Sequence, residues 1–303
     1  MDFRKLQYFQ AVAEELNFSK AARRLHVAQP ALSRAVQELE EFLGTRLLER
    51  TRRSVSLTPS GAALLHECGI LVERRDEVIR RIRRIASGEE GELRLGYIGP
   101  PTQNFLGPIV GEFRRRFPRV SVILEERTPE RVWEMVANGR LAIGLTRPAL
   151  GASYARLETT LLRKESFCAV FPQEHEFARL RRVPWARLKD SPLIILARRE
   201  SVGQHEEILA ACREAQFLPR LAHTPSLIST VLTYVEAGAG VGIIPETIIS
   251  LAASSLTARP LAPARSVDLV MVWPADNPSP VLKAFRLLVQ EWRENGLLWK
   301  SRG

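Results

Sequence analysis

Residues 18–40 have the sequence FSKAARRLHVAQPALSRAVQELE, which predicts two short helices joined by a tight turn. Ser19 is placed to cap the first helix, because its hydroxyl can accept a hydrogen bond from a free amide of the first turn. One side of that helix is apolar and carries Ala21, Ala22 and Leu25. Residues 26–28 are too few for anything but a turn. Pro30 suits the first turn of the second helix, where its missing N–H costs nothing.

The second helix separates an apolar side from a polar side. The apolar residues recur at helical spacing and would face the first helix: Ala31, Leu32, Ala35, Val36 and Leu39. The outward side carries Gln29, Ser33, Arg34 and Gln37. Arginine, glutamine and serine are side chains that read base edges in the major groove of DNA. This pattern predicts a helix-turn-helix whose second helix is the reader, and the alternative is an ordinary helical hairpin with a polar outer face.

The flanking residues extend this pair of helices into a larger unit. Residues 3–16 place apolar side chains on one face and predict a helix that packs behind the pair. After Gly44, which ends the second helix, residues 47–57 indicate two short strands around a basic turn. The arginines of this wing, Arg50, Arg52 and Arg53, would lie where phosphates or a minor groove pass. A solvated arginine cluster is the alternative.

Residues 59–87 predict one long helix that begins at Pro59 and ends before Gly88. Two adjacent columns of apolar residues repeat every seven positions: Leu64, Leu71, Val78 and Ile85 in one, and Leu65, Val72, Ile79 and Ala86 in the other. A stripe with this period favours a partner helix along its whole length. We therefore expect a dimer through this helix. The alternative is a helix that packs only on its own domain.

The rest of the chain alternates strand-like and helix-like segments after a small, flexible and charged linker at 87–91. Strands are predicted at 93–98, 120–124 and 141–145, and helices at 105–117 and 129–138. The same rhythm resumes at 167–171 and continues to a strand at 241–244, a return stretch at 267–273 and a last helix at 280–294. Alternation of this kind builds open parallel sheets with right-handed crossovers, and two such runs indicate two lobes.

A ligand of open α/β lobes lies beyond the carboxyl ends of the strands, at the N-termini of the following helices. The residues that we expect to meet this condition are Pro100, Pro101, Thr102, Thr128, Arg147, Arg198, Ser201, Thr224 and Ser226. Helix N-termini together with Arg147, Arg198 and Arg199 suit a carboxylate. We therefore expect a small anionic effector. Each serine or threonine taken alone is more often a helix cap than a ligand contact.

Composition limits the classes of protein to consider. A chain of 303 residues with ordinary apolar content indicates two domains rather than one. The net charge of +10 favours a polyanionic partner or an anionic ligand, although most of the excess lies outside the helix-turn-helix. No apolar run approaches a membrane span and no signal region is visible, so we expect a cytoplasmic protein without membrane contact. Cys68, Cys168 and Cys212 lack metal-ligand spacing, so we expect buried reduced thiols, no metal and no cofactor.

The string SKAARRLHVAQPALSRAVQELE closely resembles the DNA-binding motif of LysR-type transcriptional regulators. The flanks FRKLQYF at 3–9, LGTRLLER at 43–50 and LTPSG at 57–61 resemble it too. The resemblance implies a winged helix-turn-helix domain over 1–58, a dimerisation helix over 59–87, a hinge over 88–91 and an effector-binding domain over 92–303. It implies DNA contacts at Ser19, Lys20, Gln29, Pro30, Ser33, Arg34, Gln37, Arg50, Arg52 and Arg53.

The second domain resembles the effector-binding domain of the same regulators, an α/β domain of two lobes that is periplasmic-binding-protein-like. The resemblance places lobe I at about 92–161 and 266–303 and lobe II at about 162–265. The partners it implies are double-stranded operator DNA, a small-molecule effector, further copies of the chain that form a dimer and then a tetramer, and RNA polymerase. We expect an activator, with a repressor as the alternative, and a dimer is the alternative to the tetramer. The start of the chain and the long helix look closest to members that respond to aromatic acids or their ring-cleavage products.

One departure from the family affects the expected effector site. Many relatives place a serine or threonine directly after the glycine that closes the first strand, whereas this chain has Pro100-Pro101 before Thr102. Thr128 precedes Pro129 where relatives begin a helix with a hydroxyl residue. The register of Thr102 and Thr128 is therefore open by one residue.

Two functions of other classes compete with a ligand-responsive transcriptional regulator. An enzyme is one, because two-lobed α/β domains also host catalysis. The sequence has no glycine-rich phosphate loop, no nucleophile elbow and no clustered metal-binding set. A DNA-architectural protein without a ligand is the other, and the large second domain argues against it. The regulator is the prediction that we carry forward.

Overall fold

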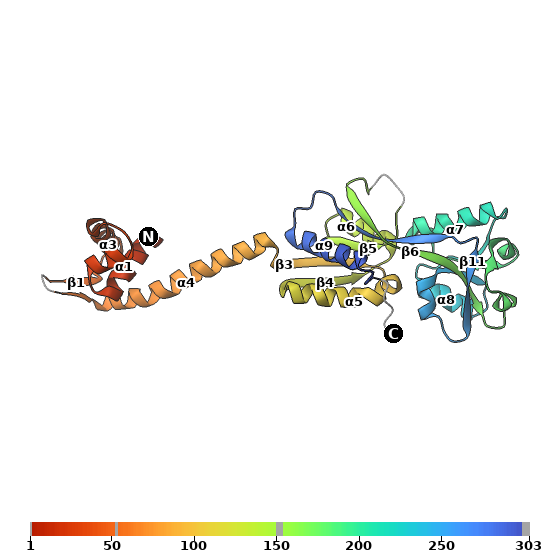
Figure 1. Ribbon diagram of the computed structural model, residues 1–303, viewed down its shortest axis with the longest axis horizontal. Coiled ribbons are helices and arrows are strands. Elements are labelled where there is room, and N and C mark those ends of the chain that lie inside the picture. The colour runs from red at the N-terminus through yellow and green to blue at the C-terminus, as the bar shows by residue number, and fades with distance from the viewer. Residues whose placement is uncertain (1, 52–53, 150–153, 299–303) are drawn as a thin grey trace. The chain divides into compact units, whose positions relative to one another are not determined.

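The computed structural model describes residues 2–51, 54–149 and 154–298. The chain divides into two compact units, residues 1–84 and residues 85–303. Figure 1 shows a small helical first unit and a second unit in which strands and helices alternate. Each unit has its own hydrophobic core and is treated separately below.

Three helices form the body of the first unit: α1 (Phe3–Glu15), α2 (Phe18–Arg24) and α3 (Gln29–Leu43). Their buried faces include Leu6, Phe9, Leu32 and Val36, as the apolar spacing predicts. The capping residue of α2 differs from the prediction. The Asn17 side chain accepts a hydrogen bond of 2.9 Å from the Lys20 amide, and Ser19 lies exposed inside the helix. Asparagine caps as well as serine does, and the helix starts two residues earlier than a Ser19 cap would allow.

The predicted wing consists of β1 (Leu48–Arg50) and β2 (Val55–Leu57), which pair antiparallel. The carboxylate of Glu40, on α3, holds the start of the wing in place. Glu40 accepts hydrogen bonds from the amides of Leu47 at 2.9 Å and Leu48 at 3.1 Å. These amides would otherwise lack partners beside the apolar core. Glu40 thereby ties the wing to the helix that precedes it.

The long helix α4 spans Pro59–Ser87, the predicted bounds. The Thr58 hydroxyl accepts a bond of 2.9 Å from the Gly61 amide and begins the helix. Glycine is required at 61, because a Cβ there would lie 2.0 Å from the carbonyl oxygen of Leu47. The proximal apolar residues, Leu64, Leu65 and Leu71, pack against the core of the first unit.

The distal part of α4 continues the same apolar face without a partner in the described chain. Val78, Ile79 and Ile82 are exposed, at 45%, 42% and 61% of their surface. The two predicted columns of apolar residues on α4 therefore have different surroundings in their two halves. Their first half packs on its own unit, as the alternative interpretation of the helix predicts, and their second half is free to meet another chain.

Only Gly88 and Glu89 separate α4 from the first strand of the second unit, β3 (Glu90–Tyr97). The hinge expected at residues 88–91 is therefore reduced to these two residues. Gly88 has φ +78°, and a Cβ there would lie 2.9 Å from Pro280, the first residue of α9 (Pro280–Glu294). A positive φ and this close approach both require glycine.

The strands of the second unit follow the order β4-β3-β5-β12-β6-β10-β8-β9, and β11 and β7 lie off this path. Their bounds are β3 Glu90–Tyr97, β4 Arg119–Glu126, β5 Ile143–Thr146, β6 Leu157–Pro172, β7 Val183–Pro184, β8 Pro192–Ile194, β9 Arg220–His223, β10 Val241–Pro245, β11 Leu256–Ala262 and β12 Ser266–Pro274. The helices are α5 Gly99–Arg116, α6 Pro129–Ala137, α7 Val202–Glu214, α8 Ile228–Glu236 and α9, with short 3₁₀ helices η2 Glu176–Arg179, η3 Trp185–Leu188, η4 Arg198–Glu200 and η5 Glu246–Leu251.

Two lobes share the long strand β6. Its first part pairs with β12, and its last part pairs with β10 and β11. Lobe I contains β3, β4, β5, α5, α6 and α9 around one core. Lobe II contains β7 to β11 with α7 and α8, which cover opposite faces of its sheet over two separate cores. The fold class predicted from the sequence is confirmed.

The strands that join the lobes differ from the predicted parallel pattern. β3, β4 and β5 pair in parallel, and so do β10, β8 and β9, but β6 and β12 are antiparallel to their neighbours. Only residues 167–171 of β6 read as a strand, because charged residues fill its first half, LETTLLRKES. Pairing of this first half with β12 overrides the weak local signal.

The three cysteines are buried and form no disulfide, and Cys68 and Cys212 belong to the separate cores of the first unit and of lobe II. Burial raises the pKa of Cys68, Cys168 and Cys212 to about 11, so these thiols stay protonated near neutral pH. The prediction that the three cysteines are buried is confirmed. Among the helices of the described residues, none combines the length and apolarity that crossing a membrane requires.

Candidate nucleic-acid interface and ligand cavity

The exposed face of α3 carries three of the predicted base readers. Gln29, Arg34 and Gln37 are all exposed, and the Arg34 side chain keeps 82% of its surface accessible. The Nε atom of Arg34 donates to Glu38 at 3.1 Å, one turn further along the helix. This ion pair on the surface is weak, so the guanidinium can leave it for a guanine edge. Ser19, Lys20 and Pro30 are exposed on the same pair of helices.

Arg50 lies in a different setting from the other predicted DNA contacts. Its Nη2 pairs with Glu40 at 2.9 Å, its guanidinium lies 4.8 Å from the ring centre of Phe18, and its Nη1 donates to the half-buried Ser33 at 3.5 Å. The Arg50 side chain keeps 29% of its surface exposed. It joins the wing to α2 and α3. Arg52 and Arg53, at the tip of the wing, lie outside the described residues.

The second unit contains a cavity of about 380 Å³ between its lobes. Lobe I contributes Ile98, Gly99, Pro100, Pro101, Glu126, Arg127, Thr128, Pro129, Arg131 and Arg147, and lobe II contributes Leu196, Gln204, Ser226, Leu227, Ile228, Pro245 and Ile248. Helices α5, α6 and α8 all begin at this cavity, and none of the three has a side-chain cap. The first turns of α6 and α8 therefore have amides available to an anion, whereas α5 has fewer, because Pro100 and Pro101 carry no N–H.

Five of the nine predicted effector residues line this cavity: Pro100, Pro101, Thr128, Arg147 and Ser226. Thr128 occupies the N-cap position of α6 but its hydroxyl makes no capping bond, contrary to one of its two expected roles. Pro100 and Pro101 fit the first turn of α5, where no N–H is needed. Ser226 also accepts a bond of 2.9 Å from Arg199.

The other four predicted residues lie away from the cavity lining. Thr102 is fully buried and donates to the Ile98 and Gly99 carbonyls, because α5 begins at Gly99 and not near Phe105 as predicted. Arg198 is exposed and pairs with Glu206 at 2.7 Å. Ser201 is buried at the start of α7, and Thr224 is exposed.

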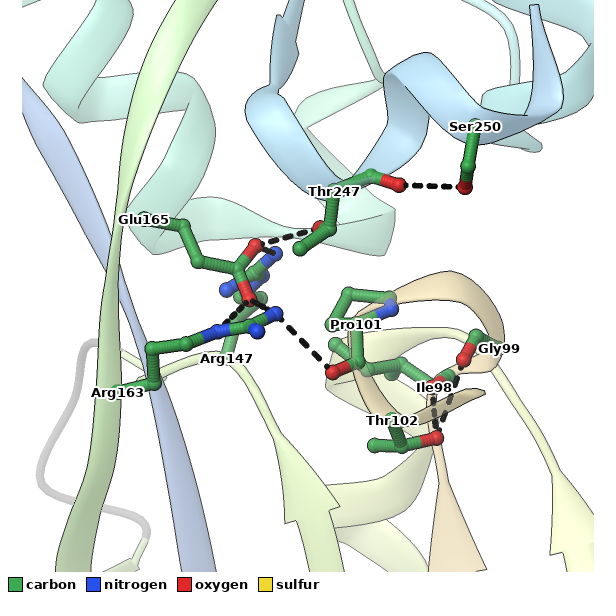
Figure 2. Close-up of polar contacts among 9 residues, drawn as sticks. All are labelled: Ile98, Gly99, Pro101, Thr102, Arg147, Arg163, Glu165, Thr247 and Ser250. Atoms are coloured by element: carbon green, nitrogen blue, oxygen red, sulfur yellow. Dashed lines mark hydrogen bonds and ion pairs between the residues drawn. The ribbon is translucent and has the colours of Figure 1, made fainter. Parts of the chain in front are cut away.

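Arg147 belongs to a buried ionic cluster that connects both lobes (Figure 2). Its Nη2 donates to Glu165 of β6 at 2.6 Å, and Glu165 also pairs with Arg163. Thr247 of η5, in lobe II, donates to the same carboxylate at 2.7 Å. Arg163 reaches the carbonyl of Pro101 in lobe I at 3.2 Å. One carboxylate therefore gathers groups from both sides of the cavity.

The charge state of this cluster follows from its neighbours. Burial works to raise the pKa of Glu165, but the positive charges of Arg147 and Arg163 outweigh burial and hold it below its ordinary value. Burial lowers the pKa of Arg147, yet a guanidinium remains protonated at every physiological pH. The cluster therefore holds two cations around one anion.

A second contact joins the lobes near the cavity. Glu130 in the first turn of α6 accepts a bond of 2.9 Å from the amide of Val202, the first residue of α7. Burial raises the pKa of Glu130. Gly203 lies against lobe I, where a Cβ would be 2.6 Å from the Pro148 carbonyl oxygen. The N-terminus of α7 is thereby fitted closely to lobe I.

Sequence reasoning missed Glu165, Thr247 and Gln204. Glu165 has the same strand parity as the buried Phe167 and Ala169, which is a signal that it points inward. Gln204 lies one turn before Ile208 on the buried face of α7 and is 3% exposed. No feature of the sequence distinguishes Thr247 from an ordinary threonine after a strand.

Comparisons with known proteins cover both units. Residues 3–62 match the family described as "Bacterial regulatory helix-turn-helix protein, lysR family", and residues 86–294 match the family "LysR substrate binding domain". The HTH-type transcriptional regulator AlsR of Bacillus subtilis is 34% identical over 287 residues, which is 94% of this chain and 94% of AlsR.

Solved structures give the same result for the whole chain. The structure of full-length CbnR in complex with its target DNA has a TM-score of 0.77 and 26% identity, and the match covers 97% of this chain and 100% of that one. Full-length BenM has a TM-score of 0.59 and 27% identity, with 98% of each chain covered.

Proposed function

The chain belongs to the LysR family, and from that membership we propose that a small organic anion binds between the lobes of its second unit and thereby changes its contacts with operator DNA. The family membership itself makes the chain a DNA-binding transcriptional regulator with an effector-binding domain, and not an enzyme. The proposal concerns the nature of the effector, its site and the response.

The observation that carries the proposal is the setting of Arg147 in the cavity. Its guanidinium is 2% exposed and lines a space where three helices begin without caps. Arg127 and Arg131 also line the cavity beside Glu126, but each is paired with a further carboxylate, Arg127 with Glu125 at 2.8 Å and Arg131 with Glu134 at 2.6 Å. Cations and free helix N-termini favour a bound anion, and a carboxylate is the common small organic anion of this kind.

The ligand would act by favouring one arrangement of the lobes. An effector shifts a conformational equilibrium only if it binds one state more tightly than the other. A molecule held by residues of both lobes meets this condition, because moving the lobes apart removes half of its contacts. The cluster around Glu165 supplies protein contacts that would respond to the same movement.

DNA reading is assigned to α3, with Gln29, Ser33, Arg34 and Gln37 toward the major groove and Ser19, Lys20 and Pro30 beside it. Arg50 is assigned to fixing the wing, and Arg52 and Arg53 remain proposed phosphate contacts. The distal face of α4 would join two chains into a dimer, which the family resemblance extends to a tetramer. The assembly would act in the cytoplasm on RNA polymerase at the promoter, as an activator.

A two-step experiment tests the effector proposal. Thermal unfolding of the full chain is recorded with a panel of small carboxylates and with their neutral amides, because a ligand of the folded state raises the melting temperature. Carboxylates that stabilise the protein are then added to a complex with a DNA site selected from random duplexes. We expect at least one carboxylate, and not its amide, to stabilise the chain and alter the DNA footprint. Stabilisation by amides alone would contradict an anionic effector, and an unchanged footprint would contradict the response.

A further inference from the structure

Two buried hydrogen-bond donors at the cavity have no partner among the described residues. They are the Nη1 atom of Arg147 and the Nε2 atom of Gln204. Both residues line the cavity, and their exposed fractions are 2% and 3%. Arg147 follows β5 in lobe I, and Gln204 lies in the first turn of α7 in lobe II. The two donors therefore approach the same space from opposite lobes.

Unpartnered buried donors are uncommon in folded proteins, because each loses its bonds to water without replacement. Arg147 already satisfies its other terminal nitrogen with Glu165, so the free Nη1 is surplus to the ionic cluster. Gln204 occupies a position of α7 where an apolar residue would pack without this cost. A polar side chain retained at such a position indicates that its partner arrives with a ligand.

The remaining lining limits the chemistry of that ligand. Proline, leucine and isoleucine side chains from both lobes form most of the wall, so the body of the ligand is apolar. A charged donor binds a charged acceptor most strongly, which assigns the carboxylate to Arg147. The amide of Gln204 is neutral, and the uncharged acceptors available to it in a small metabolite are hydroxyl and carbonyl oxygens.

We propose that Gln204 is a specificity-determining residue, and that the effector is a small carboxylic acid with an apolar body and a second oxygen, a hydroxyl or a keto group, which Gln204 binds. This inference rests on the proposed function, since it requires the anion to lie in the cavity between the lobes. It adds a second recognised group and names the lobe II residue that recognises it. A ligand that carries both groups bridges the lobes, and one that lacks the second oxygen leaves Gln204 unpartnered.

The experiment uses the full chain and matched ligands. The probes are hexanoate and 3-phenylpropanoate, each compared with derivatives that carry a hydroxyl or keto group at each carbon in turn, and binding is measured by titration calorimetry. For the parent protein we expect at least one derivative to bind about tenfold more tightly than its unsubstituted acid, the effect of one well-placed hydrogen bond in a buried site. In Gln204→Leu this advantage should fall to less than about twofold, because leucine offers no donor.

Two further readouts separate recognition from folding. Gln204→Leu removes an unpartnered buried donor, so the melting temperature of its ligand-free form should equal or exceed that of the parent. Gln290→Leu is the matched control, because Gln290 is exposed on α9 and does not line this cavity, and it should keep the full advantage of the substituted acid.

The possible results distinguish this inference from the proposed function. If no carboxylate of the panel binds the parent protein, the anionic effector itself is rejected. If carboxylates bind but no substituted acid binds better than its parent acid, or if the advantage survives in Gln204→Leu, the role of Gln204 is rejected and the anionic effector stands. A clear fall in the melting temperature of ligand-free Gln204→Leu would make Gln204 a structural residue and would also overturn the inference.

Discussion

Arg34 and Arg50 carry the same side chain but lie in different surroundings. The Arg34 side chain is 82% exposed and makes one bond along its own helix, whereas that of Arg50 is 29% exposed and contacts Glu40, Phe18 and Ser33. The sequence predicts both as DNA contacts, because both lie in the DNA-binding motif. What separates them is the position of Glu40 beside the wing, a tertiary contact that no local pattern encodes.

Arg34→Ala should reduce discrimination between operator and random DNA by about 1–3 kcal/mol, the usual contribution of an arginine that reads a guanine edge. Binding to random DNA should change little, because phosphate contacts remain. The measurement is the ratio of the two affinities at fixed salt. Arg74→Ala, at an exposed arginine of α4, is the matched control and should leave the ratio unchanged. An unchanged ratio in Arg34→Ala would exclude this residue from base reading.

Glu165→Gln should destabilise the second unit by about 3–5 kcal/mol, because it leaves Arg147 and Arg163 without a buried counter-charge. The pKa of Glu165 is lowered in the folded protein, so its stabilising effect is complete above the ordinary carboxyl pKa of about 4.3 and is lost as the pH falls through the lowered value. Urea unfolding at several pH values measures this, and the difference between parent and variant should shrink in acid.

Glu112→Gln provides the comparison on the surface. Hydrogen bonds from Arg115 and Arg116 lower the pKa of Glu112 to about 2, but the Glu112 side chain keeps 22% of its surface exposed and its partner Arg115 keeps 73%, whereas Glu165 is fully buried. Exposed ion pairs contribute little to stability, so the variant should unfold close to the parent at neutral pH. A loss as large as that of Glu165→Gln would mean that burial is not what makes the Glu165 cluster important.

The elements of the fold differ in how far their sequences predict them. α4 has the predicted bounds because proline, an uninterrupted helical pattern and Gly88 define it locally. α5 begins at Gly99, earlier than predicted, because two prolines in its first turn look like a loop in sequence. β6 runs from Leu157 although its first half is charged, since its pairing with β12 is decided by tertiary structure.

The distal face of α4 gives a prediction at the scale of the element. Ile82 is 61% exposed on the same face as Leu71, which packs against the first unit's core. Ile82→Glu should therefore weaken the dimer, on the order of 100-fold, by placing an unpaired charge in an apolar contact between helices. Sedimentation across a concentration series measures it.

The control for Ile82→Glu makes the same kind of change away from α4. Leu287→Glu alters an exposed leucine of α9 and should leave the assembly unchanged. Leu71→Glu is a poorer test than the columns alone suggest, because it would also disturb the core of its own unit. An unchanged sedimentation coefficient for Ile82→Glu would leave the apolar face of α4 without a role in assembly.

At the scale of the whole molecule, the sequence predicts which loops and helix starts border the cavity better than it predicts the buried polar groups around it. Strand ends and helix starts follow from the alternation of elements, and five residues predicted on that basis line the cavity. Glu165 and Gln204 come from the middle of a strand and from the buried face of a helix. Their roles depend on how the two lobes meet, which involves segments far apart in the chain.

The short connection between α4 and β3 gives the last prediction. Two residues, Gly88 and Glu89, separate α4 from β3, so a change in the second unit passes to the helix with little slack. Insertion of Gly-Ser-Gly-Ser-Gly between them adds a flexible segment at small entropic cost. Allosteric response is a coupling free energy between two sites, distinct from affinity at either site. The insertion should therefore keep ligand affinity and DNA affinity, and lose the change in DNA bending that the ligand causes.

Titration calorimetry measures ligand affinity, and a DNA-binding assay measures DNA affinity. Energy transfer across a doubly labelled operator measures the change in DNA bending. All three measurements use one preparation of the protein. The same peptide inserted between Arg181 and Arg182, both exposed in lobe II, is the control and should preserve the bending response. Loss of ligand or DNA affinity in the junction variant would mean that the connection supports one of the units itself. A bending response that survives the insertion would show that the ligand reaches the DNA-binding unit by a route that bypasses this connection, because a flexible segment transmits no rotation.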